Sequence, residues 1–438
     1  MKKRLWKRII CCATILTMVI GTTTGCASKD SNKDSNGVIT LTIMDWESET
    51  MNTAMQDAFD NVFSKEHPNI KVKILPAPQG DYGLKVNQMI SAKKAPDIFQ
   101  AGHDMALSLS KKGMVTDFSE KANADTEFTQ GFYPGTYELW KDGDKTIGFP
   151  SLLNVYGIFY NIDKLKEARL EIPQNGWTFD DLYQYADTLK DTANGKFGLY
   201  NFESNPFKVS LVSVSNGGQP FVDDIQNPTT ITCDDKFIEA TTQLRENIAK
   251  GAVAPPTYEA QNIQSSFTDG SIPMIQYGQW LIDDLIRNAP ETLNWGYVAN
   301  PVGTTGKQCA TFDAVGWCSP TGLDHADEVW ELMKFMSSDI YKTVIPVTPV
   351  AACANEDAAQ EFFDKVTEDG HPEAAEAVKT MINAETRVEV RYLTTWGGDA
   401  GKIWDATWND ILESKNGKDV DAIPDMVNKV NELIKSQR

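Results

Sequence analysis

The sequence predicts an α/β protein built around a parallel sheet, and three observations lead to this prediction. Apolar β-branched segments alternate with segments of helical periodicity between residues 38 and 113. The chain has 438 residues, 41% of them hydrophobic and 10% aromatic, enough for two or three domains or one large bilobal body. No Pro/Gly-rich linker divides the body, so we expect two lobes that interleave in the sequence.

The first elements alternate strictly between strand and helix. The predicted strands are apolar and β-branched, and they span 38–44, 70–75 and 96–99. The predicted helices repeat apolar residues at three and four positions, and they span 51–67, 84–94 and 105–112. This βαβαβα order implies a parallel sheet with helices on its faces.

The remaining elements are less regular in order. Further strands are expected at 146–149, 156–160, 271–277, 295–298 and 315–318. Further helices are expected at 177–190, with Thr178 as N-cap, and at 237–250. From 326 to 438 the pattern is mostly helical. No internal repeat is visible.

The N-terminus has the pattern of a secretory signal. Residues 1–8 carry five cations and no acid, and an apolar run over 9–21 follows. Cys26 comes directly after small residues, which resembles a bacterial lipobox with Thr23 in place of the usual Leu. We therefore expect a lipoprotein signal peptide over 1–25 and lipidation of Cys26. A membrane-spanning anchor and cleavage with free secretion are the alternatives.

The charge of the chain excludes one class of partner. The net charge is −20, and loss of the five cations of the signal takes it to −25. A surface this acidic lacks the clustered Lys and Arg that neutralise nucleic-acid phosphates. Residues 26–37 are rich in Ser, Asn, Asp and Lys, which predicts a disordered tether.

A series of short motifs carries a family resemblance over nearly the whole mature chain. Their order and spacing resemble the extracytoplasmic solute-binding proteins of carbohydrate ABC importers, the maltose-binding-like family. The motifs are Phe63-Ser-Lys-Glu-His-Pro-Asn-Ile-Lys-Val, Ala95-Pro-Asp-Ile-Phe, Lys112-Gly-Met-Val-Thr-Asp-Phe, Phe149-Pro, Tyr160-Asn-Ile-Asp-Lys-Leu, Trp177-Thr-Phe-Asp-Asp-Leu, Phe267-Thr-Asp-Gly, Met274-Ile-Gln-Tyr-Gly-Gln-Trp and Val315-Gly-Trp.

The resemblance implies a bilobal periplasmic-binding-protein-like fold of type II, with two α/β lobes, a hinge and a ligand cleft. Lobe one would hold 38–149 plus 300–345, and lobe two would hold 150–299 plus 346–438. It also implies an extracytoplasmic, lipid-anchored protein that captures a carbohydrate and delivers it to the permease subunits of an ABC importer. We expect a monomer that is not an enzyme and needs no cofactor.

Candidate ligand residues follow from strand ends and from the resemblance. Sugar hydroxyls need carboxylate and amide partners, and the apolar faces of sugars need flat aromatic rings. Residues that follow the first three predicted strands lie at the cleft rim by topology. The rim set comprises Trp46, Glu47, Gln79 and Asp104.

The resemblance adds further candidates in the rest of the chain. Trp280 follows Gly278-Gln279 and matches the family's Gly-x-Trp, whose ring stacks on sugar. The others match polar or aromatic cleft positions of the family or lie at a strand or helix end. They are Asn154, Asn205, Asp313, Trp317, Trp396 and Trp404.

Other classes of function remain open at this stage. Two Ser-x-x-Lys matches lack their companion motifs, the four His show no metal-ligand spacing, and neither a P-loop nor Gly-x-Gly-x-x-Gly occurs. A secreted glycoside hydrolase needs only two opposed carboxylates, which 61 acids cannot exclude. A binding protein for a non-sugar solute such as a polyamine is the other alternative. Cys309 and Cys318 are either a disulfide or two buried thiols.

Overall fold

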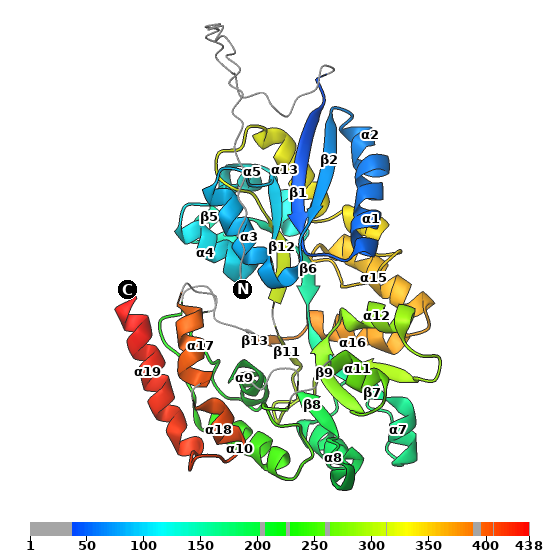
Figure 1. The fold of residues 1–438 in the computed structure, drawn as a ribbon, viewed down its shortest axis with the longest axis vertical. Coiled ribbons are helices and arrows are strands. Elements are labelled where there is room, and N and C mark those ends of the chain that lie inside the picture. Colours follow the sequence, from blue (N-terminus) through cyan, green and yellow to red (C-terminus); the bar gives the residue numbers. More distant parts are fainter. Residues whose placement is uncertain are drawn as a thin grey trace, which may run out of the picture.

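A computed structural model describes residues 37–201, 206–224, 228–258, 263–311, 313–388, 396–405 and 407–437. The predicted signal peptide, Cys26 and Asn205 lie outside the described residues, as does the tether except for Gly37. Figure 1 shows two lobes stacked along the long axis of the molecule, each with its own sheet. The bilobal α/β fold of type II is confirmed.

The first lobe is built on a five-stranded sheet of order β2-β1-β3-β12-β6. β1 is parallel to β2 and β3, as predicted, whereas β12 is antiparallel to both β3 and β6. The amino end of β12 therefore shares one sheet edge with the carboxyl ends of β1, β3 and β6. The strands are β1 (Ile39–Asp45), β2 (Ile70–Pro76), β3 (Ile98–Gly102), β6 (Phe149–Asn154) and β12 (Asp313–Cys318).

The helices of the first lobe begin earlier than the sequence pattern suggests. Ser48 caps α1 by accepting a hydrogen bond from the amide of Met51 at 3.2 Å. α3 begins at Gln79 rather than Leu84, and α4 begins at His103 rather than Met105. The helices are α1 (Glu49–Ala58), a π turn (Phe59–Phe63), α2 (Ser64–Glu66), α3 (Gln79–Ser91), α4 (His103–Lys111), α5 (Ser119–Ala124), α6 (Thr126–Gln130), a 3₁₀ turn (Glu138–Trp140), α13 (Ala326–Met336) and α14 (Ile340–Val344).

The second lobe has a four-stranded mixed sheet of order β10-β7-β9-β8. The strands are β7 (Tyr156–Asn161), β8 (Leu199–Asn201), β9 (Met274–Gly278) and β10 (Trp295–Val298). Two-stranded pairs join β4 (Lys141–Asp142) to β5 (Lys145–Thr146), and β11 (Cys309–Thr311) to β13 (Thr386–Val388).

Helices surround this second sheet (Figure 1). α8 opens with a capping box, in which Thr178 and Asp181 satisfy each other's backbone amides. The helices are α7 (Ile162–Glu167), α8 (Phe179–Leu189), a 3₁₀ turn (Thr192–Asn194), α9 (Pro206–Ser215), α10 (Asp235–Ala249), α11 (Ile263–Thr268), α12 (Leu281–Asn288), α17 (Gly397–Asp405), α18 (Trp408–Leu412), a 3₁₀ turn (Val420–Ala422) and α19 (Ile423–Ser436). α15 (Glu356–Glu368) packs on α14 of the first lobe and on α16 (Pro372–Ile382), and α16 also contacts β10.

The chain passes from one sheet to the other at Val155. β6 ends at Asn154 in the first sheet, and β7 begins at Tyr156 in the second. Residues 150–154, which we expected in lobe two, thus belong to the first sheet because β6 pairs with β12. The strand predicted at 146–149 is also wrong: β5 ends at Thr146 and β6 begins at Phe149.

The structure also bears on the possible disulfide and on membrane-spanning helices. Cys309 and Cys318 are both buried and both free, so the disulfide alternative is not realised. Among the described residues, no helix combines the length and apolar character needed to cross a membrane.

Candidate functional site

A cavity of about 500 Å³ lies where strand ends of the two sheets converge. Its first-lobe wall consists of residues on or next to β1, α3, α4, β6 and β12, namely Trp46, Glu47, Gln79, Gly102, Asp104, Leu152, Asn154, Asp313 and Val315. Its second-lobe wall consists of Tyr156, Tyr277 and Trp280. Val350 and Ala351 complete the lining. The volume is in the usual range for a small-molecule site.

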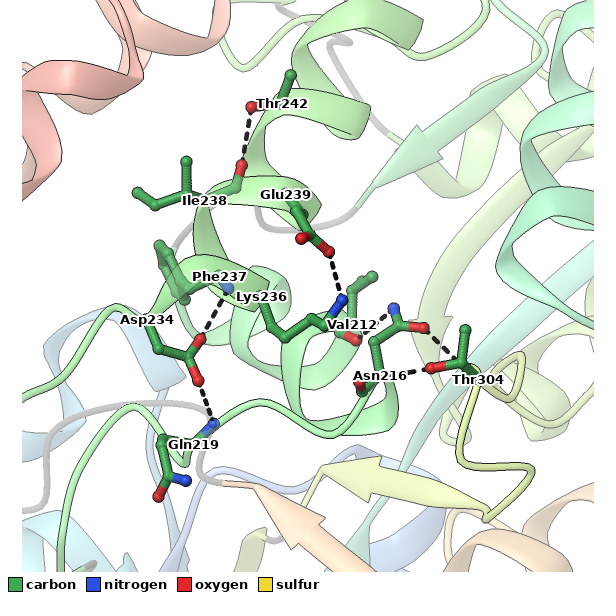
Figure 2. Close-up of polar contacts among 10 residues, drawn as sticks. All are labelled: Val212, Asn216, Gln219, Asp234, Lys236, Phe237, Ile238, Glu239, Thr242 and Thr304. Atoms are coloured by element: carbon green, nitrogen blue, oxygen red, sulfur yellow. Dashed lines mark hydrogen bonds and ion pairs between the residues drawn. The ribbon is translucent and has the colours of Figure 1, made fainter.

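A second hollow of about 580 Å³ lies between α8, α10 and the loop at 302–304, which we expected in lobe one but which packs against the second lobe. Figure 2 shows that its polar side chains bind each other: Asn216 accepts from the Thr304 amide at 2.9 Å, and Lys236 pairs with Glu239 at 2.7 Å. The interlobe cavity is the better candidate because ligands of open α/β sheets bind where the carboxyl ends of strands meet.

Gln100 on β3 holds the loop that follows β1. Its Nε2 donates to the Glu47 carboxylate at 2.6 Å, and its Oε1 accepts from the Trp46 amide at 3.3 Å. Gln100 itself is fully buried, whereas Trp46 and Glu47 are half-buried and line the cavity. The Trp46 ring meets Tyr82 edge-on, with centroids 4.8 Å apart. One buried amide therefore sets the position of two cleft residues.

Burial raises the pKa of two carboxyl groups at the end of β1 and in the loop that follows it. Burial raises the pKa of Glu47 to about 7, with the nearby charge of Asp45 adding to the rise and the Gln100 hydrogen bond opposing it. Burial also raises the pKa of Asp45, against hydrogen bonds from Asn52 and the Glu47 amide. Glu47 can thus be either a hydrogen-bond acceptor or a donor near neutral pH.

Four further polar residues lie at the starts of β12 and α4 and at the end of β6. Asp313 Oδ1 lies 3.1 Å from His103 Nδ1, with both side chains buried, and Asp313 Oδ2 lies 3.5 Å from Asn154 Nδ2. Asp104 is in the first turn of α4, where the helix dipole favours a negative charge. Asp104, Asp313 and Asn154 line the cavity and present two carboxyl groups and one amide to it, whereas His103 is buried behind them.

The second-lobe wall is aromatic. Trp280 meets Tyr156 and Tyr277 edge to face, with interplanar angles of 86° and 64° and centroids 5.3 and 5.5 Å apart. The buried Lys208 on α9 places its Nζ 3.8 Å from the centroid of the Tyr156 ring. Such contacts are favourable beyond the apolar area that they bury, so this wall offers ring surface in a fixed arrangement.

The structure brings seven of the predicted ligand residues to the cavity and leaves three others elsewhere. Trp317 is buried in the first lobe, and its indole N–H donates to the Met336 carbonyl at 3.0 Å. Trp404 packs on Phe221 and on Trp408 in the second-lobe core. Trp396 is 8% exposed and belongs to the same core cluster. In this structure the three side chains are buried among core residues and do not line the cavity, contrary to the prediction.

Sequence reasoning missed Tyr156 and Tyr277, which lie within predicted strands. Tyr156 is the first residue of β7 and Tyr277 the fourth of β9. Including the terminal residues of each predicted strand would have found Tyr277, which ends the strand predicted at 271–277, and Tyr156. Within the described part of the chain, no group of three or more His, Cys, Asp or Glu is placed to hold a metal ion.

Comparison with known proteins identifies a family. Residues 58–343 match the family model described as bacterial extracellular solute-binding protein. Escherichia coli YcjN, named for an ABC transporter's periplasmic binding component, is 26% identical over 280 residues. That match covers 63% of this chain and 62% of the relative. A multiple sugar-binding protein of Streptococcus mutans is 26% identical over 184 residues, 40% of this chain and 42% of its own.

Solved structures share the fold at low identity. An ABC substrate-binding protein of Listeria monocytogenes, in complex with cycloalternan, has a TM-score of 0.75 at 21% identity and covers 91% of this chain and 98% of its own. The cyclic alpha-maltosyl-1,6-maltose binding protein of Arthrobacter globiformis has a TM-score of 0.74 at 17% identity, covering 91% and 100%.

Proposed function

This chain belongs to the bacterial extracellular solute-binding proteins, and we propose that it captures an oligosaccharide between its two lobes and delivers it to an ABC importer. The observation that carries the proposal is the pairing of walls in the cleft. Carboxylates and amides on the first-lobe wall face three aromatic rings on the second-lobe wall. A sugar needs both kinds of contact at once.

Closure on the ligand follows from this placement. Because each lobe supplies one kind of contact, a bound sugar that touches both walls favours the state in which the lobes are close together. A transporter can then distinguish the loaded protein from the empty one. Named relatives that bind sugars, including cycloalternan in one structure, support the assignment of the ligand class.

The anchoring of the protein is a second part of the proposal. A lipid on Cys26 would tether the folded body outside the cytoplasmic membrane through residues 26–37, as a monomer. The extracellular nature of the family supports this location. Mass spectrometry of the mature protein tests the anchor: a diacylglycerol-modified Cys26 at the N-terminus is expected, and an unmodified N-terminus beyond Cys26 would rule it out.

A thermal-shift screen of the purified mature chain tests the ligand class. The panel contains maltotetraose, cycloalternan, cyclic maltosyl-maltose, α-D-tagatose and spermidine. We expect at least one oligosaccharide to raise the Tm, since a ligand that binds only the folded state stabilises it. We also expect that sugar to be recovered intact after hours of incubation. Hydrolysis of the sugar would instead favour a glycoside hydrolase, and stabilisation by spermidine alone would favour a polyamine-binding protein.

A further inference from the structure

Trp280 has a close neighbour without a side chain. Gly278 lies two residues before it, at the end of β9, where it pairs with Tyr156 of β7. The indole of Trp280 therefore has Gly278 on one side and the rings of Tyr156 and Tyr277 around it. These neighbours decide where the indole lines the cavity.

The six-membered ring of the indole fills the space that a side chain at residue 278 would need. A Cβ built on Gly278 would lie 2.0 Å from Cζ3, 2.1 Å from Cη2 and 2.4 Å from Cε3 of Trp280. Carbon atoms in contact are normally about 3.5–4.0 Å apart. The φ of Gly278 is not positive, so the backbone would accept another residue. It is the indole, and not the chain conformation, that requires glycine here.

We propose that Gly278 is a positioning residue of the cleft, which lets the indole of Trp280 lie against the end of β9 where a bound sugar can meet it. Its role in binding rests on the proposed function. The three atoms nearest to an added methyl group all belong to the Trp280 side chain. Alanine at residue 278 should thus displace the Trp280 side chain rather than backbone atoms, and the β7–β9 pairing should stay in place.

Two other glycines provide matched controls. A Cβ on Gly296 of β10 would lie 2.4 Å from Cζ of Tyr160, which is 1% exposed in the second-lobe core. Gly296→Ala should therefore lower the Tm, because the ring of Tyr160 has no space to move into. A Cβ on Gly401 in α17 meets nothing within 4 Å, so Gly401→Ala should leave the protein unchanged or slightly more stable.

The first test needs no ligand. The mature protein is labelled with 5-fluorotryptophan, and the ¹⁹F resonance of Trp280 is assigned by its loss in Trp280→Phe. In Gly278→Ala we expect this resonance to shift while those of the other tryptophans remain; Gly401→Ala should leave all of them in place. An unshifted Trp280 resonance in folded Gly278→Ala overturns the proposal, whether or not any sugar binds.

The second test measures the Kd for the panel sugar that stabilises the wild type most. We expect Gly278→Ala to weaken binding about tenfold, the scale of one aromatic contact, and to add no further loss in a Trp280→Ala background. Equal losses in both backgrounds overturn the proposal. If Gly278→Ala is unstable, adding Trp280→Ala should restore the Tm. A double variant whose Tm stays low also overturns the proposal. A wild type that binds no panel sugar contradicts the proposed function, and the ¹⁹F result then decides the role of Gly278 alone.

Discussion

The first-lobe wall of the cleft carries three carboxylates and two amides, whereas the second-lobe wall carries two tyrosines and one tryptophan. The polar groups are supplied by the ends of β1, β6 and β12 and the starts of α3 and α4. Trp46 is the single ring on the polar side, and it is held by the buried Gln100. Apart from Trp46, polar groups and ring surface are thus divided between the lobes, so under the proposed function neither lobe alone would offer a sugar both kinds of contact.

The largest expected effect separates rings of the core from rings of the cleft. Trp317→Ala should lower the free energy of unfolding by about 3–5 kcal/mol, because a buried tryptophan leaves a large cavity behind. Urea unfolding of the variant and the wild type measures this change. At temperatures where the variant is folded, its affinity for the panel sugar should match that of the wild type. A loss of affinity without a loss of stability would show that Trp317 contacts the ligand, and would contradict the division between core rings and cleft rings.

Trp280→Ala tests the second-lobe wall directly. We expect its affinity for the panel sugar to fall by about 2 kcal/mol, roughly thirtyfold in Kd, as for a central aromatic contact. The unfolding free energy should change much less than in Trp317→Ala because Trp280 is only partly buried. Isothermal titration calorimetry measures the Kd. An unchanged Kd would contradict a stacking contact between the Trp280 ring and the sugar.

Glu47→Gln tests whether the raised pKa of Glu47 lowers the free energy of unfolding of the ligand-free protein above pH 4.5. The folded state keeps the Glu47 proton up to about pH 7, whereas the unfolded chain releases it near 4.5. The contribution of Glu47 to wild-type stability should therefore fall as the pH rises from about 4.5 to about 7 and stay level above that range. The variant lacks this loss, so it should be more stable than the wild type by about 1–3 kcal/mol at pH 8 and equal to it at pH 4.

Urea unfolding at pH 4, 6 and 8 checks this dependence. Trp280→Ala is the matched control, since it removes no ionisable group and its difference from the wild type should not vary with pH. A Glu47→Gln difference that is constant over the three pH values would contradict the raised pKa of Glu47.

Asn154→Ala should have the smallest effect. Its amide lies at the end of β6, partly exposed and 3.5 Å from Asp313. We expect a loss of about 0.5–1.5 kcal/mol in binding, the usual net value of one hydrogen bond. Competition binding against the panel sugar can resolve this change. A loss larger than that of Trp280→Ala would place the main contact on the first-lobe wall instead.

The ends of the strands were predictable from the sequence. Most of the residues that line the cleft were predictable for the same reason. Glu47 and Asp104 follow apolar runs whose order fixes a parallel sheet, so topology alone brings them together. The prediction of Trp280 rested on the family resemblance, because the sequence of β9 does not indicate in which direction the strand runs in the sheet.

Trp317 shows why other residues were placed wrongly. β12 runs antiparallel to its neighbours, so Asp313 begins at the cleft and Trp317, four residues later, lies deep in the sheet opposite Gln100 and Phe149. A register shift between Val315 and Gly316 alters the pairing further. Gln100 was missed because a buried strand residue has no periodic signal that marks its hydrogen-bond partners.

The single residue between the two sheets has a mechanical consequence. Asn154 and Tyr156 flank Val155, and each lines the cavity from a different lobe. Val155 itself is buried, and its carbonyl accepts from the Gln279 amide at 3.0 Å. Any rotation of one lobe against the other must therefore twist the backbone at this point. A ligand that contacts Asn154 and Tyr156 would therefore touch both lobes within one residue of this connection.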